Sequence, residues 1–438
     1  MRSNPACRLP LRGHTALAIG LLLGVWACSG TSSSQSVAQV AVHTTCAPSG
    51  GALVIHVCGN RLVDGKDSTV QLRGVSVAGL EGVAVAGWQP DNPWGGNTGT
   101  PTPDWELMKT WGVNTVRIPL NEASWLGATC ADMGGSGVHF VGGTKTQNAP
   151  GEMVAADPGH NYRETVGTAV SQATQAGLYV ILDLHWSAPG NACPTGQNAM
   201  ADADHSLTFW TAVATTFKGS PNVIFELFNE PFLDQAPLQD STPLEALRDG
   251  KGTIASYNVQ GKPGTIKYPW HPVGMQQMLV AVRATGATNV VLTSTPAYSS
   301  AIDGWLQSRP TDTLNPSQIA AVWHSYPAGG FPMQTGCIGL PSCSDRIMEA
   351  ATAIQAAGYP VVITEFGDKV GGSAAPFASM LLPFADKNGI SYLAWTWDNW
   401  IGTDFYLISD GAGHPTAGYG TYVKQHYHCR TTGAANCL

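Results

Sequence analysis

The sequence predicts a single (β/α)8 barrel, and three observations support this prediction. Short apolar runs rich in β-branched residues alternate with longer helical stretches along most of the chain, which is typical of parallel β-structure. The chain has 438 residues, and barrels of this kind commonly exceed about 250 residues as one unit. No internal repeat or second domain is visible, and Gly74 and Gly79 do not form the G-x-G-x-x-G turn of a dinucleotide-binding sheet.

Eight segments have the composition of strands that are buried on both faces. In chain order they span residues 70–77, 114–120, 178–186, 222–230, 289–295, 320–326, 360–366 and 390–397. Helical stretches lie between them, among them residues 203–218, 274–286, 344–358 and 377–389. Glycine often stands where a helix should end, as at Gly177, Gly286, Gly358 and Gly389. This alternation favours a closed barrel over an open doubly wound sheet.

Residues 1–27 have the pattern of a secretory signal peptide. Arginines precede an apolar stretch over residues 16–27, which is too short for a membrane-spanning helix. Ordinary signal peptidase would cleave after Ala27, but the same residues followed by Cys28 resemble a bacterial lipobox. The Ser/Thr/Gly-rich tether over residues 28–50 favours this second interpretation. We therefore expect a secreted, cell-surface or periplasmic protein with a lipid anchor at Cys28 and a folded domain over residues 51–438.

Charge and cysteine content restrict the class of protein further. The formal net charge is −8 at pH 7, which argues against nucleic acid as a partner because phosphate binding needs a basic surface. Eight cysteines follow Cys28, and an even number behind a signal peptide predicts disulfides. A metal cluster is the alternative, but the chain contains no C-x-x-C. The spacing suggests the pairs Cys46–Cys58, Cys337–Cys343, Cys429–Cys437 and Cys130–Cys193.

Polar and aromatic residues end six of the eight predicted strands. Taken singly, each has a structural explanation, such as an arginine in an ion pair, a histidine bonded in the core or a packed aromatic ring. Taken together they fall on one rim, because the carboxyl ends of barrel strands meet there and barrel enzymes place their catalytic groups at that end. In chain order they are Arg117, His185, Trp186, Asn229, Glu230, His324, Tyr326, Glu365, Trp395 and Trp397.

Two glutamates among amide, imidazole and aromatic groups suit the hydrolysis of a glycosidic bond. One carboxylic acid protonates the leaving oxygen, and a second carboxylate attacks the anomeric carbon or activates water. A metal-dependent hydrolase is the rival, but the sequence lacks H-E-x-x-H, and we expect no metal or cofactor. Asp202 and Asp204 could bind a cation, but they stand before a helical stretch, where aspartate favours the helix N-terminus as a cap.

The segment VIFELFNEPF at residues 223–232 resembles the signature of glycoside hydrolase family 5, which contains barrel endoglucanases and mannanases. The resemblance continues in order through VRIPL, LDLHW, FNEP, WHSYP, ITEFG and ISYLAW and covers about residues 68–428. It implies Glu230 as the general acid/base and Glu365 as the nucleophile of a retaining mechanism, with the two carboxyl groups about 5–5.5 Å apart.

The resemblance also implies what the neighbours of these glutamates do. Arg117 and Tyr326 are expected to hold Glu365 in its ionised form. His324 is expected to form a hydrogen bond with Glu230 or with the sugar. A carboxylate beside a second carboxyl group raises that group's pKa, so we expect Glu230 to keep its proton in the free enzyme.

Three further positions are expected to contact the sugar itself. The amide of Asn229 donates to the sugar 2-hydroxyl, a bond that strengthens as the transition state forms. His185 contacts hydroxyls of the reacting ring, and Trp395 stacks beneath it. Looser candidates for outlying subsites, for which packing is at least as good an explanation, are Trp94, Trp125, Trp186, Trp397 and Trp400.

Other features are interpreted as structural or as modifiers of specificity. Glu226 lies four residues before the proposed acid in the same strand, so it has the same facing parity, and we expect it to pair with Arg73 or Arg117. Long loops follow the second and third predicted strands, at residues 121–157 and 187–206, and a bridge between their cysteines would tie them together over the cleft.

We therefore expect a monomeric, secreted retaining β-glycosidase whose partner is a β-linked polysaccharide. The first substrate is a β-1,4-glucan cleaved internally, as by an endoglucanase. Endo-β-mannanase, xyloglucanase and exo-β-glucosidase activities are the alternatives within the family. A non-catalytic carbohydrate-binding barrel is the alternative of a different class, and the presence of both glutamates argues against it.

Overall fold

The computed structural model describes most of the chain after the predicted signal and tether. The described residues are 46, 50–82, 94, 102–130, 139–141, 144–146, 153–155, 161–190, 196–255, 269–327, 341–399 and 404–433. The predicted signal peptide and nearly all of the tether lie outside these ranges. Within them, no helix is both long enough and apolar enough to cross a membrane.

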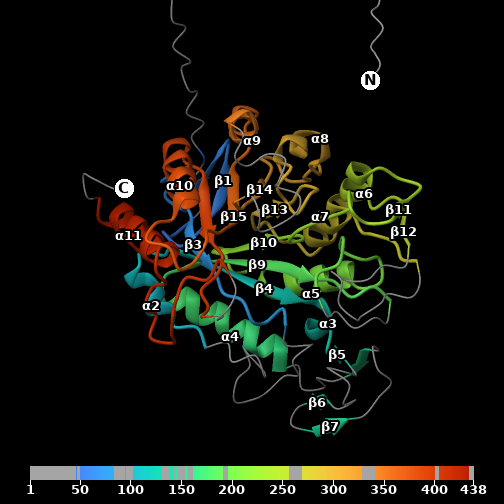
Figure 1. The fold of residues 1–438 in the computed structure, drawn as a ribbon. Coiled ribbons are helices and arrows are strands. Elements are labelled where there is room, and N and C mark those ends of the chain that lie inside the picture. The colour runs from blue at the N-terminus through green and yellow to red at the C-terminus, as the bar shows by residue number, and fades with distance from the viewer. Residues whose placement is uncertain are drawn as a thin grey trace, which may run out of the picture. The chain divides into compact units, whose positions relative to one another are not determined.

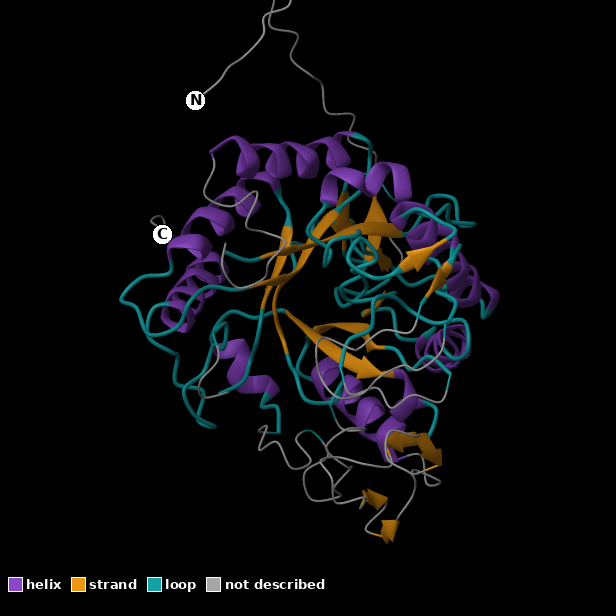
Figure 2. Ribbon diagram, turned by 45° about the vertical axis from the view of Figure 1, so that its right-hand side comes forward, coloured by secondary structure: helices purple, strands orange, loops and turns teal. Residues whose placement is uncertain are grey.

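Eight parallel strands form a closed barrel, as the sequence predicts. They pair in chain order, and the last strand pairs with the first to close the barrel. Figure 2 shows the strands in orange surrounded by helices in purple. The strands are β3 (Arg73–Ser76), β4 (Thr115–Asn121), β9 (Tyr179–Trp186), β10 (Val223–Glu226), β13 (Val291–Thr293), β14 (Ile319–Ser325), β15 (Val361–Phe366) and β16 (Ser391–Ala394).

The helices lie between the strands in sequence, and the four predicted ones are confirmed to within a few residues (Figure 1). All four glycines predicted to end helices adopt left-handed backbone conformations, with φ between 63° and 90°, which glycine adopts at little cost. The helices are α2 (Trp105–Thr110), α3 (Glu122–Trp125), α4 (Asn161–Gln175), α5 (Ser206–Phe217), α6 (Pro243–Asp249), α7 (Met275–Ala284), α8 (Trp305–Ser308), α9 (Pro341–Ala356), α10 (Pro376–Asn388) and α11 (Tyr419–Thr432), with a 3-10 turn at Ile302–Gly304.

Alternate residues of each strand face two different cores. Ile181, Ile224, Leu292 and Val362 belong to a small cluster inside the barrel. Their sequence neighbours belong to a larger cluster between the strands and the helices. This alternation follows from the two-residue period of a strand. The polar side chains of the predicted site lie beyond these apolar layers, at the carboxyl ends of the strands.

A small hairpin covers the end of the barrel opposite the strand carboxyl ends. It consists of β1 (His56–Cys58) and β2 (Arg61–Val63). The Ile55 N–H donates to the carbonyl of Pro221, just before β10, and the Val57 N–H donates to the side chain of Gln318, just before β14. The sequence did not predict this hairpin, whose apolar side chains join the cluster inside the barrel.

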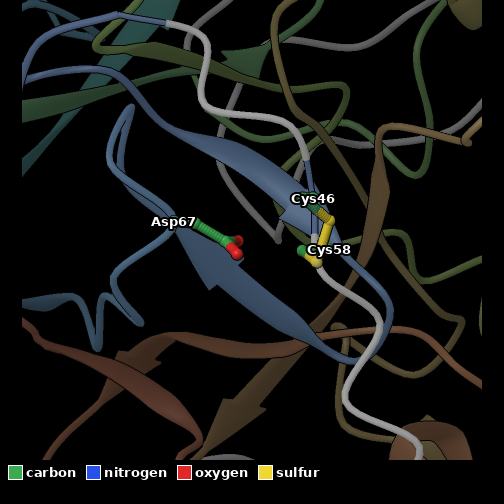
Figure 3. A group of neighbouring side chains, drawn as sticks. All are labelled: Cys46, Cys58 and Asp67. Carbon is green, nitrogen blue, oxygen red and sulfur yellow. A yellow bond between two sulfur atoms is a disulfide. The ribbon is translucent and has the colours of Figure 1, made fainter.

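One predicted disulfide is confirmed at this hairpin. Cys46 and Cys58 are bonded, and the carboxylate of Asp67 lies beside them (Figure 3). Cys429 is also disulfide-bonded, but Cys437 lies outside the described residues. The predicted pairs Cys130–Cys193 and Cys337–Cys343 involve side chains outside the described part of the chain, so they remain predictions.

The long loop after the second barrel strand contains short antiparallel pairs that the sequence did not predict. One pair is β5 (Ala128–Cys130) with β8 (Met153–Ala155), and the other is β6 (His139–Val141) with β7 (Thr144–Thr146). A third pair, β11 (Leu238–Gln239) with β12 (Thr253–Ile254), follows the fourth barrel strand. These pairs lie in connections at the end of the barrel where the predicted site residues lie.

Candidate active site

A buried arginine is the centre of the predicted site. Arg117 extends from β4 and is 0% exposed. Its guanidinium lies 2.9 Å from a carboxylate oxygen of Asp183 and 2.7 Å from oxygens of both Glu226 and Glu365. Burial alone would lower the pKa of Arg117, but the three carboxylates outweigh it and raise the pKa further. Arg117 is therefore a permanent cation, and its predicted contacts with Glu226 and Glu365 are confirmed.

Glu226 is part of the framework beneath the site. Besides Arg117, it accepts a hydrogen bond from the Thr364 hydroxyl at 2.9 Å. Burial opposes its ionisation, but the charge of Arg117 and the bond from His324 outweigh burial and lower the pKa of Glu226 to about 2. Glu226 is thus a fully buried, ionised side chain with Arg117 as its partner, which agrees with the structural interpretation.

His324 links this framework to Glu230. Its Nδ1 lies 2.8 Å from Glu230 Oε1, and its Nε2 lies 2.9 Å from the Thr364 hydroxyl. Burial lowers the pKa of His324, but the charge of Glu365 and the bonds to Glu226 and Glu230 outweigh it and raise the pKa to about 10. His324 therefore carries a proton on each ring nitrogen, and its predicted contact with Glu230 is confirmed.

Glu365 is held in its ionised form by several donors. The Tyr326 hydroxyl donates to Oε2 at 2.6 Å, and Arg117 donates to Oε1 at 2.7 Å. Burial raises the pKa of Glu365, but the charges of His324 and Arg117 outweigh burial, so the net shift is downward. The predicted contacts of Arg117 and Tyr326 with Glu365 are both present.

The two glutamates at the rim are close together and differ in protonation. One oxygen of Glu230, one of Glu365 and a ring nitrogen of His324 all lie within 4.8 Å of one another. Glu230 and Glu365 are 6% and 4% exposed. Burial, followed by the charge of Glu365, raises the pKa of Glu230. The site therefore pairs a carboxylic acid with a carboxylate.

The stretch from Phe228 to Pro231 is fixed through its backbone carbonyls. Ser294 donates to Phe228, the Ser299 hydroxyl donates to Asn229 at 2.7 Å, Gln197 donates to Glu230, and the Tyr298 N–H donates to Pro231 at 2.9 Å. These four hydrogen bonds hold the main chain in place and so fix the positions from which the side chains of Asn229 and Glu230 extend.

Three of these four donors follow the fifth barrel strand, where the sequence showed no candidate. Ala297, Tyr298 and Ser299 all have left-handed φ angles of 56° to 61°, a conformation that costs non-glycine residues energy and is often found at functional sites. No sequence signal marks this turn, because serine and alanine have no preference for it.

His185 and Trp395 lie side by side at the rim. Their rings are stacked, with centroids 5.6 Å apart and planes 7° apart. His185 Nδ1 lies 2.7 Å from Asp183 Oδ2, and its Nε2 lies 3.5 Å from Asn229 Nδ2. Burial lowers the pKa of His185, but the bond to Asp183 and the charge of Asp183 raise it overall.

Asp183 is a site residue that the sequence analysis missed. It is fully buried and contacts both Arg117 and His185. The available signal was its position two residues before His185, which places both side chains on the same face of β9.

The five tryptophans considered for outlying subsites differ in burial. Trp94, Trp125 and Trp397 are buried, as packing predicts. Trp186 is half-buried, and Trp400 lies outside the described residues.

The predicted helix-capping role of Asp202 and Asp204 is wrong. The N-cap residue of α5 is His205, which makes no side-chain capping bond, and Asp204 accepts from the Gly190 N–H at 2.7 Å. Asp202 instead stabilises the turn before the helix. Its Oδ1 accepts from the N–H groups of Asp204 and His205, at 3.0 and 2.9 Å, just before α5. Glu122, Asp202 and His205 have the spacing of a metal site, but the two carboxyl groups are hydrogen-bonded to each other. The sequence also contains one H-x-H triplet, at residues 426–428, and the His426 Nε2 of this triplet lies 3.0 Å from a carboxylate oxygen of Asp386.

Comparison with known proteins gives one family match. A model described as cellulase (glycosyl hydrolase family 5) matches residues 63–400. Endoglucanase N from Pectobacterium atrosepticum is 24% identical over 384 residues, which cover 87% of this chain and 63% of that protein. Endoglucanase 1 from Saitozyma flava is 26% identical over 353 residues, 78% of this chain and 92% of that protein. The chain spans only 26% of the length of Endoglucanase MaCel5A from Microbulbifer, another relative.

Solved structures share the fold at low sequence identity. The native β-glucanase SdGluc5_26A from Saccharophagus degradans has a TM-score of 0.57 at 20% identity, with 86% of this chain and 94% of that chain covered. A β-mannanase from Streptomyces thermolilacinus, solved with mannohexaose, has a TM-score of 0.50 at 17% identity, with 88% and 97% covered. The barrel architecture of this chain is therefore shared with a β-glucanase and a β-mannanase.

Proposed function

The chain belongs to glycosyl hydrolase family 5 and is a glycoside hydrolase, and from this premise we propose that it is a retaining endo-β-1,4-glucanase. The observation that carries the proposal is the pair of close carboxyl groups with opposite pKa shifts. Retaining enzymes need about 5–5.5 Å between the groups, whereas inverting enzymes need about 6.5–9.5 Å to admit a water. One oxygen of Glu230 and one of Glu365 lie within 4.8 Å of each other, and this close approach favours retention.

In the first step, the carboxylate of Glu365 attacks the anomeric carbon while Glu230 gives its proton to the departing glycosidic oxygen. A glycosyl ester forms on Glu365 and the bond to the leaving sugar breaks. In the second step, Glu230, now a carboxylate, takes a proton from water as the water oxygen attacks the anomeric carbon. The ester bond breaks, Glu365 is released as a carboxylate, and Glu230 is protonated again.

The other site residues support these two steps. Arg117 and Tyr326 orient Glu365 and keep it ionised, and His324 orients Glu230. Because Asn229 and His185 lie beside the acid, they contact hydroxyls of the reacting sugar.

The exposed part of the half-buried Trp395 provides a stacking face for that sugar. This assignment extends the observed stack of Trp395 on His185 to a bound ring, since both side chains lie at the rim where the substrate enters.

Glucan is favoured over other sugars because several relatives carry the name endoglucanase. A fold neighbour, the β-glucanase SdGluc5_26A, was solved with cellotetraose. β-Mannan is the second candidate, because another fold neighbour is a β-mannanase solved with mannohexaose. Xyloglucanase and exo-acting β-glucosidase activities are the remaining candidates. Family membership favours all of these over a non-catalytic barrel.

The proposal includes secretion and a lipid anchor at Cys28, with the enzyme acting as a monomer. Its support is the pattern of residues 1–50. Labelling of the full-length protein in a bacterial host with a radioactive fatty acid tests the anchor. Label that disappears in Cys28→Ala supports it, and an unlabelled wild-type protein contradicts it.

Sugar release from cellulose, mixed-linkage glucan, galactomannan, xyloglucan and xylan tests substrate and nucleophile together. Wild type, Glu365→Ala and the surface control Glu106→Ala are compared. We expect release from a glucan, a loss of about 10³-fold or more in Glu365→Ala, and no change in the control. Azide should restore Glu365→Ala and give the α-glycosyl azide. Wild-type inactivity on every polymer, or an unimpaired Glu365→Ala, contradicts the proposal.

A further inference from the structure

Gln197 connects two residues of the proposed site, although no motif marks it. It lies in the loop after β9 and is 4% exposed. Its Oε1 accepts a hydrogen bond from Asn229 Nδ2 at 3.0 Å, and its Nε2 donates to the backbone carbonyl of Glu230 at 2.5 Å. One side chain therefore contacts the carboxamide expected to bind the sugar and the main chain of the expected acid.

The hydrogen bonds through Gln197 have one possible direction. Arg117 has only donors, so the Asn229 side chain must turn its oxygen toward Arg117, at 2.6 Å. At the other end the Glu230 carbonyl only accepts, so Gln197 must turn its nitrogen toward it. The Asn229 nitrogen and the Gln197 oxygen then face each other. The chain runs from Arg117 through Asn229 and Gln197 to Glu230, and both amide orientations are fixed.

This arrangement leaves Asn229 one amide hydrogen for the substrate. Its nitrogen carries two hydrogens, and Gln197 accepts one. The same nitrogen also lies 3.5 Å from His185 Nε2, a distance too long for a strong hydrogen bond. The second hydrogen is therefore the one that a sugar hydroxyl can take.

We propose that Gln197 is a positioning residue, which orients the Asn229 carboxamide and the Glu230 main chain so that one amide hydrogen faces the reacting sugar. This inference rests on the proposed glycosidase function. Gln197 touches no reacting atom, so it acts through Asn229 and Glu230. Its loss should lower the rate of the chemical step more than substrate binding, because the bond to the 2-hydroxyl strengthens in the transition state.

The loop that carries Gln197 has its own supports. The Phe232 N–H donates to the Ala199 carbonyl at 3.1 Å, and the Ser187 hydroxyl donates to the Met200 carbonyl at 2.8 Å. Asn198 donates to the Ser187 carbonyl at 2.7 Å. Removal of the Gln197 amide alone therefore leaves the loop in place.

A double-mutant cycle measures whether Gln197 acts through Asn229. Gln197→Met keeps the size of the side chain and removes its polar atoms. We expect it to lower kcat by about 10–100-fold and to change KM by less than about 3-fold. In an Asn229→Ala background the same change removes only the bond to the Glu230 main chain, so it should cost less in kcat than it does in the wild-type background. Equal losses in both backgrounds, or a kcat within about 2-fold of wild type, overturn the proposal.

A conservative variant adds a pH-dependent test. In Gln197→Glu, a protonated carboxylic acid can donate to the Glu230 carbonyl and accept from Asn229, whereas the carboxylate can only accept. Gln197→Glu should therefore approach wild-type kcat at acid pH and lose it as pH rises, while the folded fraction measured by circular dichroism stays constant. A loss that does not depend on pH, or that follows the folded fraction, contradicts a positioning role.

Asn198 provides the matched control. It is the neighbouring amide, is 1% exposed, and also donates to a backbone carbonyl, but that carbonyl belongs to its own loop. Asn198→Ala should lower the melting temperature and leave kcat within about 2-fold of wild type. A kcat loss as large as that of Gln197→Met would show that the loop, and not Gln197, is responsible.

One measurement does not depend on the identity of the sugar. A crystal structure of Gln197→Met should show the Asn229 carboxamide turned away from its wild-type plane, with its oxygen still on Arg117. An unmoved Asn229 overturns the proposal whatever the enzyme cleaves. If wild type is instead inactive on every polymer, the proposed function fails and the crystal structure still decides the role of Gln197.

Discussion

At the scale of single residues, burial and neighbouring charges together set the protonation of the site. The buried cations Arg117 and His324 face the carboxylates of Asp183, Glu226 and Glu365. Burial, followed by the charge of Glu365, raises the pKa of Glu230 against the opposing effect of His324, so this carboxyl group keeps its proton to higher pH. Burial also acts to raise the pKa of Glu365, but the charges of His324 and Arg117 outweigh burial and keep Glu365 ionised to lower pH.

Tyr326→Phe tests this balance through the pH profile. The hydroxyl donates to Glu365 and favours its ionised form, so its removal should raise the pKa of Glu365. The pKa of Glu365 sets the acid limb of kcat/KM and that of Glu230 sets the alkaline limb. We therefore expect the acid limb to move to higher pH, with a loss of about 10–100-fold at the optimum. Steady-state kinetics across pH provide the measurement.

Tyr359→Phe is the matched control for this variant. It makes the same change just before β15, at the opposite end of the strand that carries Glu365. Its pH profile should match that of wild type. If Tyr326→Phe also leaves the acid limb where it was, Tyr326 does not control the ionisation of Glu365.

At the scale of elements, a buried carboxyl pair joins the connections that follow two barrel strands. Glu122 lies in α3 directly after β4, and Asp202 lies just before α5. Both are fully buried and contact the Ala188 N–H. Burial and the charge of Asp202 raise the pKa of Glu122, whereas bonds from Glu122 and His205 lower the pKa of Asp202 against the effect of burial. Glu122 therefore holds the shared proton.

Glu122→Gln and Asp202→Asn should differ in their effect on stability. The folded state keeps the Glu122 proton at pH values where the unfolded chain has lost it, so the free energy of unfolding falls as pH rises from the ordinary glutamate pKa to the folded value. Glu122→Gln removes this dependence and should gain stability relative to wild type as pH rises. Asp202→Asn removes the acceptor and should cost about 1–3 kcal/mol.

Thermal melting across pH checks both variants. Each serves as the control for the other, because both replace a buried carboxyl group by an amide of the same size. If the two variants lose the same stability at every pH, the proton is not held by Glu122.

A register shift in β15 is the second decisive feature at this scale. Ile363 pairs with Trp323, and Glu365 pairs with the next residue, His324, so Thr364 is an extra residue in the ladder. Strict alternation would turn Glu365 away from the barrel interior, since Ile363 packs in the outer core. The bulge lets both Thr364 and Glu365 reach the site, which is a common use of bulges beside active sites.

At the scale of the whole molecule, the two ends of the barrel have separate roles. The carboxyl ends of the strands carry the site, and the opposite end is closed by the hairpin β1–β2 and the Cys46–Cys58 disulfide. In barrels of this kind, features at that lower end contribute stability and not chemistry.

Replacing both Cys46 and Cys58 by serine tests this separation. The disulfide spans a sequence separation of 12, and loops of this length contribute about 2–4 kcal/mol. The variant should unfold at a lower temperature, while kcat and KM, measured well below that temperature, stay within about 2-fold of wild type. An unchanged melting temperature contradicts the stabilising role, and a large loss of kcat at low temperature contradicts the separation.

The sequence by itself determined the barrel and most of the rim. Strand composition and helix-ending glycines are local properties, so all eight strands and four helices could be predicted from them. The type of residue at each strand end is also local, and strand ends of a parallel barrel meet on one rim by geometry. Glu230, Glu365, Arg117, His324 and Tyr326 could be placed together for this reason.

Only the tertiary structure decided which atoms bond and which way they face. Gln197 meets Asn229 across 32 residues of separation, and the donors after β13 reach the Asn229 and Pro231 carbonyls through a left-handed turn that no residue type signals. The bulge at Thr364 depends on pairing with a neighbouring strand. Hydrogen-bond partners, register and protonation are set by the surroundings of a side chain, and those surroundings come from distant parts of the chain.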